Sequence, residues 1–172
     1  MSVFTESLPV DSTSRLRAVA EMLRIDPERW YQGSWMTYNG EIVFDESPLD
    51  AILGFGPIDC DTNTACIAGW GLLLTPREQL RELPGVTSAE GWVSAASAAL
   101  GLQPSRYVNG RGEIEGEQPT LADHLFAQDA DADLNNNGLA KVLDALADIP
   151  ENERTWEEFE YRWPSLAEAL EH

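Results

Sequence analysis

Hydrophobic residues recur at three- and four-residue intervals along most of this chain, which is the spacing of one face of an α-helix. The first such stretch follows Ser12 or Ser14, either of which can cap a helix, and it stops before Pro27. Thr155 and Ser165 are the predicted caps of the last two helices. Between these ends, helices are predicted within 60–74, 76–83, 88–100, 120–126 and 139–149. The pattern therefore predicts a mainly α protein.

Two Asn-Gly pairs predict short β-hairpins between these helices. Asn39-Gly40 separates the runs 36–38 and 41–44, and Asn109-Gly110 precedes the run 113–115. The favoured two-residue hairpin turn needs positive φ at both central residues, which Asn and Gly adopt readily. The segment 47–58 contains two prolines and two glycines and is predicted to be a connector.

The segment 60–74 is predicted to be the central helix, lying under the six tryptophans of the chain. Its cap is expected among the polar residues 61–64. Gly69 and Gly71 interrupt the apolar run, and each costs a helix about 1 kcal/mol relative to alanine. We therefore expect another backbone or large side chains to approach this helix closely.

A chain of 172 residues is long enough for one hydrophobic core, because it can bury about two-thirds of its unfolded surface. We expect residues 1–172 to form a single compact helical domain with one or two short β-hairpins. Residues 1–11 are expected to be a flexible N-terminus, and residues 113–172 an acidic last third of the same domain.

The net charge of −19 is unevenly distributed along the chain. Residues 113–172 hold sixteen acidic residues against three basic ones, and residues 41–75 hold six acidic residues and no base. Such a surface repels nucleic-acid phosphates and anionic membranes, and it attracts basic protein surfaces or cations. The expected partner is therefore a basic protein, with no direct binding of nucleic acid and no membrane association.

No window reaches the ~18 apolar residues of a membrane span, and the first ten residues lack a secretory pattern. The expected location is the cytoplasm. Cys60 and Cys66 are too few for a disulfide framework, and reduced thiols are expected in that compartment.

One segment has the spacing of an EF-hand calcium loop. Asp133, Asn135 and Asn137 stand at loop positions 1, 3 and 5, Gly138 at the turn position, and Asp144 at position 12. Alternating oxygen ligands and a glycine at the bend are what calcium needs. The alternative is that Asn137 or a neighbour caps a helix that begins near residue 139. No other cofactor is expected.

Cys66 is a candidate nucleophile. A thiol near a helix N-terminus can have a lowered pKa, and His124 could act as its base. However, Cys66 lies in an apolar run that is typical of a buried and unreactive cysteine. No local residue orients the histidine. The spacing of Cys60 and Cys66 is also wider than that of common zinc sites.

Large hydrophobic residues alternate with acids near the C-terminus. The predicted partner-binding residues are Glu151, Glu153, Trp156, Glu157, Glu158, Glu160, Tyr161 and Trp163. Carboxylates around aromatic anchors suit a basic partner, and they could also mimic nucleic acid. Alternatively, the aromatic residues belong to the core and the acids form its solvated side. Both interpretations stay open at this point.

Three motifs follow one another along the chain. They are 27–35, with Pro27, Glu28, Trp30, Gln32, Gly33 and Trp35; 62–70, which reads Thr-Asn-Thr-Ala-Cys-Ile-Ala-Gly-Trp; and 96–102, with Ala96, Ala99, Leu100, Gly101 and Leu102. Their order resembles a family of small, acidic, uncharacterised actinobacterial and phage proteins, over most of residues 14–148. The resemblance implies no reaction, cofactor or catalytic residue. The run 36–44 and the acidic C-terminus depart from the family pattern.

The leading hypothesis is a non-enzymatic acidic protein that binds a basic partner, as a phage-related inhibitor or nucleic-acid mimic. The alternative is a small calcium-binding module built on the loop 133–144. A weaker alternative is a thiol-dependent enzyme built on Cys66.

Overall fold

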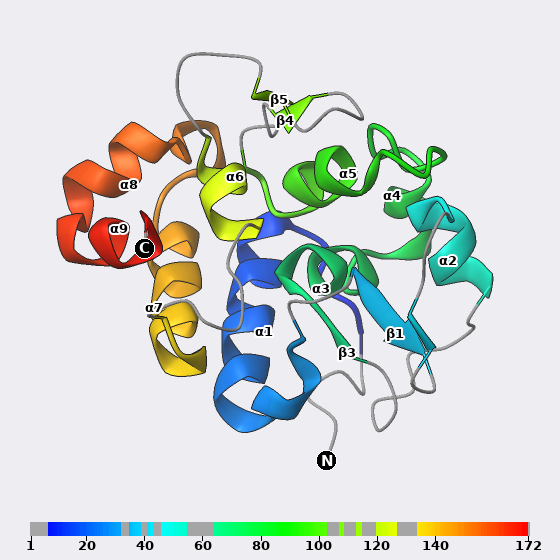
Figure 1. Cartoon of the computed structure of the whole chain (residues 1–172), viewed down its shortest axis with the longest axis horizontal. Helices are drawn as coiled ribbons and strands as arrows, with labels where there is room; N and C mark the ends of the chain where they lie inside the picture. Colours follow the sequence, from blue (N-terminus) through cyan, green and yellow to red (C-terminus); the bar gives the residue numbers. More distant parts are fainter. Residues whose placement is uncertain are drawn as a thin grey trace.

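The two longest described helices, α1 (Ser12–Ile25) and α7 (Asn136–Ala147), lie side by side (Figure 1). The structure is a computed structural model that describes residues 7–31, 35–38, 41–42, 46–54, 64–102, 107–108, 113–114, 120–126 and 134–171. Apolar residues at helical spacing, among them Leu16 and Leu23 of α1 and Val142 and Leu146 of α7, are fully buried. Both helices confirm the prediction from hydrophobic spacing.

The cap of α1 differs from the predicted Ser12 or Ser14. The Asp11 carboxylate accepts a hydrogen bond from the Ser14 backbone N–H at 2.8 Å and another from the Ser14 hydroxyl at 2.9 Å. Ser12 is the first residue of the helix and is buried. The carboxylate of Asp11 is the better acceptor for the free N–H groups of the first turn.

A three-stranded sheet precedes the central helix. Strand β1 (Met36–Tyr38) pairs antiparallel with β2 (Glu41–Ile42), with Thr37 opposite Ile42, which confirms the first predicted hairpin. On its other side β1 pairs with β3 (Thr64–Ala65), so the order is β2-β1-β3. A 3-10 turn, η1 (Pro27–Arg29), leads from α1 toward this sheet.

Helix α3 (Ile67–Leu73) lies near the middle of the molecule, and all seven of its residues are buried (Figure 1). A Cβ atom placed on Gly69 would come within 1.8 Å of the Trp35 carbonyl oxygen, and one on Gly71 would meet the Leu100 side chain. The expected close approach is confirmed. The helix begins later than predicted, because residues 64–65 pair in the sheet and Cys66 is the cap.

The prediction of a connector over 47–58 is wrong for its first part, which forms helix α2 (Pro48–Gly54). The Ser47 hydroxyl accepts a hydrogen bond from the Asp50 backbone N–H at 3.2 Å. Pro48 occupies the first helical position, where its missing N–H costs nothing. Serine followed by proline is thus a helix start here. Residues 55–58 lie outside the described part.

Two short helices and a second hairpin follow α3. Helix α4 (Arg77–Leu80) and helix α5 (Trp92–Ala99) both lie within predicted helical stretches. Strands β4 (Tyr107–Val108) and β5 (Glu113–Ile114) pair antiparallel and confirm the second predicted hairpin.

The C-terminal part consists of helix α6 (Leu121–Phe126), the 3-10 turn η2 (Glu151–Glu153) and two helices, α8 (Trp156–Arg162) and α9 (Pro164–Glu171). Thr155 caps α8 as predicted, accepting from the Glu158 backbone N–H at 3.2 Å. One cluster of buried residues includes members of α1, α3, α5, α6, α7, α8 and α9. The described chain is therefore a single compact helical domain. None of its described helices is long and apolar enough to span a membrane.

Candidate partner-binding surface

The exposed residues of η2, α8 and α9 are mostly acidic. We call six exposed glutamates and one exposed tyrosine of these elements the C-terminal acidic surface: Glu151, Glu153, Glu157, Glu160, Tyr161, Glu168 and Glu171. Helices α8 and α9 pack against each other at the left edge of the molecule in Figure 1. Their apolar residues, such as Phe159 and Leu170, face the core. Helical spacing thus places the acids on the solvent-facing side of these short helices and the apolar residues on the side that faces the core.

Tyr161 is the exposed aromatic residue of this surface, with 84% of its area accessible. Trp156 is 7% exposed and Phe159 is fully buried, so Trp156 offers little surface to a partner. Its partner-binding role stays a prediction that its burial does not support. Trp163 is partly buried and packs against the core, 6.1 Å from Phe159 between ring centroids. The alternative interpretation of the aromatics as core residues is correct for Trp156 and Phe159, but not for Tyr161.

Arg162 is the one exposed base within η2, α8 and α9. Its guanidinium donates to the Glu158 carboxylate at 2.5 Å and lies 3.6 Å from that of Glu153. These pairs are solvent-exposed and contribute little to stability. No ion pair of the described residues involves Glu157, Glu160 or the two glutamates of α9.

Arg154 precedes these helices and is only 1% exposed. Its Nε donates to the carbonyl oxygens of Leu146 and Ile149, both at 3.0 Å. Its Nη1 donates to the Leu100 carbonyl at 3.3 Å and to the Ser12 hydroxyl at 2.7 Å. The guanidinium therefore joins the C-terminal ends of α5 and α7 to the start of α1.

Burial lowers the pKa of Arg154, while the carboxylates of Glu151 and Asp11 raise it. Its charge is stabilised chiefly by carbonyls at helix C-termini, which carry partial negative charge. No sequence pattern marks this role, because the partners come from segments far apart in the chain.

A second buried guanidinium lies at the same helix end. Arg15 of α1 is 4% exposed and donates to the Ala99 carbonyl at 2.8 Å and to the Val10 carbonyl at 3.2 Å. It also donates to the Gln79 side-chain oxygen. Together with Arg29, three basic residues of the described part are buried, against one acidic residue, Asp123, so the accessible surface of that part is more acidic than its composition indicates.

The three predicted calcium ligands that the structure describes belong to helix α7 and its cap, not to a loop. Asn135 caps α7, and its side-chain oxygen accepts from the Gly138 backbone N–H at 2.9 Å. Asn137 lies within the helix, and the Asp144 carboxylate lies 2.5 Å from Arg24 and 3.7 Å from Arg17. The alternative of a capped helix is thus correct.

Asp133 lies outside the described residues. Within the described part, no group of three or more His, Cys, Asp or Glu side chains could hold a metal. Calcium binding stays a prediction, for which the helical geometry supplies no support.

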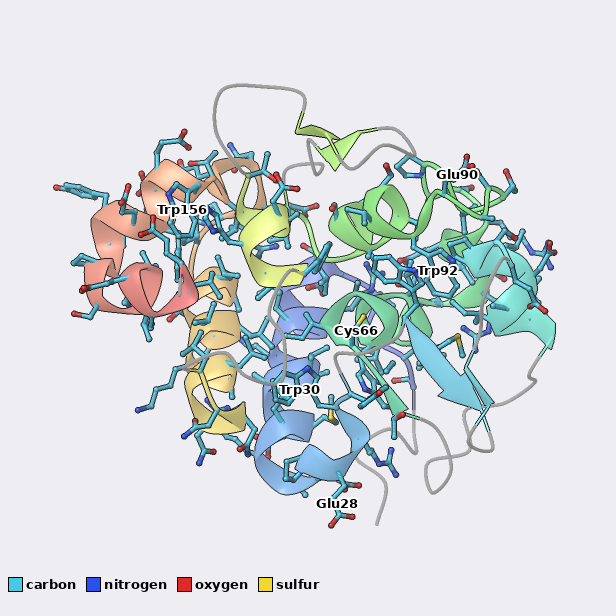
Figure 2. The ribbon with its side chains drawn as sticks, in the orientation of Figure 1. Glu28, Trp30, Cys66, Glu90, Trp92 and Trp156 are labelled. Atoms are coloured by element: carbon cyan, nitrogen blue, oxygen red, sulfur yellow. The ribbon has the colours of Figure 1, made fainter. Side chains whose placement is uncertain are left out.

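Cys66 is buried at the start of α3. Its sulfur accepts from the Gly69 backbone N–H at 3.4 Å and donates to the Trp35 carbonyl at 3.8 Å. Burial raises the pKa of this thiol to about 11, opposite to what a nucleophile requires. His124 stacks on Trp156, with centroids 3.9 Å apart, and Figure 2 places Trp156 well away from Cys66. Cys60 lies outside the described residues.

No protein-family model matches this chain, and no curated protein or solved structure matches it either. The resemblance to the acidic actinobacterial and phage family therefore stays a prediction.

Proposed function

We propose that this protein binds a basic partner protein through its C-terminal acidic surface. The observation that carries the proposal is Tyr161, an aromatic side chain that is 84% exposed on the same helix as Glu157 and Glu160, two exposed glutamates that form no ion pair within the described residues. Tyrosine is enriched at the energetic centres of interfaces, because it offers a large apolar area and a hydroxyl at low entropic cost. Surrounding carboxylates would then select a partner with positive charge.

The burial of arginine elsewhere strengthens this selectivity. Arg15, Arg29 and Arg154 contribute little to the accessible surface, and Arg162 is engaged with Glu153 and Glu158. A basic partner therefore meets a field of one sign, which accelerates association and weakens as salt is added. The same field disfavours a nucleic-acid ligand.

The finer proposal is that the protein acts as an inhibitor by imitating the phosphates of nucleic acid. Fixed carboxylates on α8 and α9 would occupy the site of a nucleic-acid-binding protein. This proposal requires that the captured partner lose its own nucleic-acid binding when the complex forms.

The test compares two double variants with the same net charge. Glu157→Gln with Glu160→Gln removes two charges from the C-terminal acidic surface. Glu28→Gln with Glu90→Gln removes two exposed charges from other parts of the molecule, as Figure 2 shows. Each is immobilised beside the wild type and exposed at low salt to an extract of cells that carry the gene, and the captured proteins are quantified.

We expect the first variant to retain about fivefold less of a basic protein than the wild type. The second variant should retain the wild-type amount. Equal losses in both variants would mean that only net charge matters, and would contradict a defined binding surface. Retention of the partner by both variants would contradict the proposal as well.

A further inference from the structure

A pocket lies beside the C-terminal acidic surface, between the end of α5 and the start of α8. Its volume is about 320 Å³, and its walls are formed by Ala98, Gly101, Leu102, Glu151, Asn152, Arg154 and Thr155. Binding cavities for small ligands begin at about 300 Å³, so the pocket suits one side chain rather than a large cofactor.

The pocket has an apolar wall and a polar wall. Ala98 and Leu102 supply apolar surface at the end of α5, whereas Glu151 and Asn152 are exposed polar residues of η2. No ion pair of the described residues involves Glu151. A ligand with an apolar stem and a cationic end would match both walls.

Arg154 also lines the pocket, and its positive charge must be considered. The guanidinium is 1% exposed, and it already donates to three backbone carbonyls and to the hydroxyls of Ser12 and Thr13. These oxygens, together with the carboxylates of Glu151 and Asp11, offset its charge where it lies. The exposed charge of the pocket is therefore that of Glu151.

Gly101 allows the end of α5 to lie close to η2. Its φ of 65° lies in the left-handed region, and a Cβ atom there would come 2.7 Å from both Arg154 Nη1 and Glu151 Cγ. Only a residue without a side chain lets the end of α5 approach so near to η2. The backbone thus places the Glu151 stem against the buried guanidinium, beside the apolar wall.

We infer that this pocket receives a lysine or arginine side chain of the basic partner, with the alkyl stem on Ala98 and Leu102 and the cationic group on Glu151. The inference rests on the proposed function, and it names the part of the partner that would anchor the complex. Glu151 belongs both to the pocket and to the C-terminal acidic surface, so one partner could contact both.

The test uses blocked single amino acids and nuclear magnetic resonance of the ¹⁵N-labelled full chain. The probes are N-acetyl-lysine methylamide, N-acetyl-arginine methylamide and, as a control without charge, N-acetyl-norleucine methylamide. We expect saturable shifts of the Gly101, Leu102 and Asn152 amides with a dissociation constant on the order of 1 mM for a charged probe. The norleucine probe should cause none, and the tighter charged probe identifies the head group that is preferred.

Glu151→Gln should weaken the charged probe by at least about threefold, while Glu157→Gln, outside the pocket, should leave it unchanged. Ala98→Leu should fill the pocket and prevent probe binding. If the Ala98→Leu protein does not fold, the effect of Glu151→Gln on probe binding is sufficient to test the inference. Absence of saturable shifts at roughly 20 mM probe, or equal binding of norleucine, overturns the inference.

These outcomes are separate from those of the capture experiment. If the surface variant loses the partner but no probe binds, the proposed function stands and the pocket inference fails. If probes bind but neither double variant changes capture, the proposed function fails by itself.

Discussion

The helical pairs α1–α7 and α8–α9 use charged residues in opposite ways. On the first pair, Arg17 of α1 lies 2.7 Å from Asp148, the C-cap of α7, and Arg24 lies 2.5 Å from Asp144. On the second pair, Arg162 is the only exposed arginine or lysine, and Glu157, Glu160, Glu168 and Glu171 form no ion pair within the described part of the chain. The acids at this end of α7 are therefore paired with bases of α1, whereas the acids of α8 and α9 are those that we propose a partner to contact.

Arg154 lies between these two pairs, and its replacement should have the largest effect. Arg154→Met keeps the length of the side chain but leaves the buried acceptors at the ends of α5 and α7 without their donor. We expect the free energy of unfolding to fall by about 3 kcal/mol, measured by urea denaturation. Arg162→Met, on the exposed side, should change it by less than about 1 kcal/mol. Equal losses of stability in the two variants would contradict the conclusion that Arg154 supports the fold and Arg162 does not.

Gly101→Ala tests the junction through the backbone. The positive φ and the contacts with Ser12 and Arg154 predict a loss of about 2 kcal/mol in the free energy of unfolding. Gly54→Ala is the matched control, because a Cβ atom there meets nothing within 4 Å. That control should be neutral or slightly stabilising in the same thermal or urea measurement.

The stack of His124 on Trp156 connects α6 to α8 and predicts a dependence on pH. Burial lowers the pKa of His124 below its ordinary value of 6.5, although the carboxylates of Glu171, Asp123 and Glu160 raise it. The unfolded chain therefore binds a proton more readily, so stability is full above pH 6.5 and falls as the pH drops below it.

The measurement is the urea midpoint at pH 7.5 and at pH 5.5, compared in wild type and His124→Gln. The wild type should lose more stability on acidification than the variant does. An identical loss in both proteins would assign the effect to other groups.

Removing an acid should change the free energy of unfolding in opposite directions on the two helical pairs, although by a smaller amount. Asp144→Asn removes the ion pairs with Arg17 and Arg24, and we expect a loss of about 0.5 kcal/mol that shrinks with added salt. Glu157→Gln relieves repulsion among neighbouring carboxylates, so stability should stay the same or rise slightly. A clear loss in Glu157→Gln would show that the acidic surface also supports the fold.

The smallest change in stability is expected at Tyr161. Because the side chain is 84% exposed, Tyr161→Ala should alter the free energy of unfolding by less than about 0.5 kcal/mol. Capture of the basic partner should nevertheless decrease by about tenfold or more if this residue anchors the interface. If Tyr161→Ala captured as much of the partner as the wild type, Tyr161 would not be an anchor of the interface.

Hydrophobic spacing and turn residues predicted much of the fold. The helices within 88–100, 120–126 and 139–149, and both hairpins, depend on residues close together in sequence. The glycines of α3 also indicated a close approach to this helix, and the structure identifies Trp35 and Leu100 as the neighbours. The missed helix α2 had a local signal as well, a serine cap followed by proline at its first position.

The candidate site was predicted less completely. Sequence spacing located the acids of α8 and α9, but it could not assign Trp156 to the interior and Tyr161 to the surface. Both are aromatic residues of one short helix, and their exposure depends on where α6 and α9 pack. The EF-hand spacing did not predict the local structure for a similar reason, since Asn135 caps α7 and Asp144 pairs with Arg24 of α1. Calcium binding itself stays a prediction.

The sequence by itself determined the helical class, the two hairpins and the concentration of sixteen acids in residues 113–172. Only the tertiary structure decided which charges are used inside the molecule. Arg154 is buried because residues 12, 100 and 146 meet around it, and Asp144 is paired because α1 lies along α7. Local spacing governs helix formation, whereas the availability of a charge depends on neighbours that are distant in the chain.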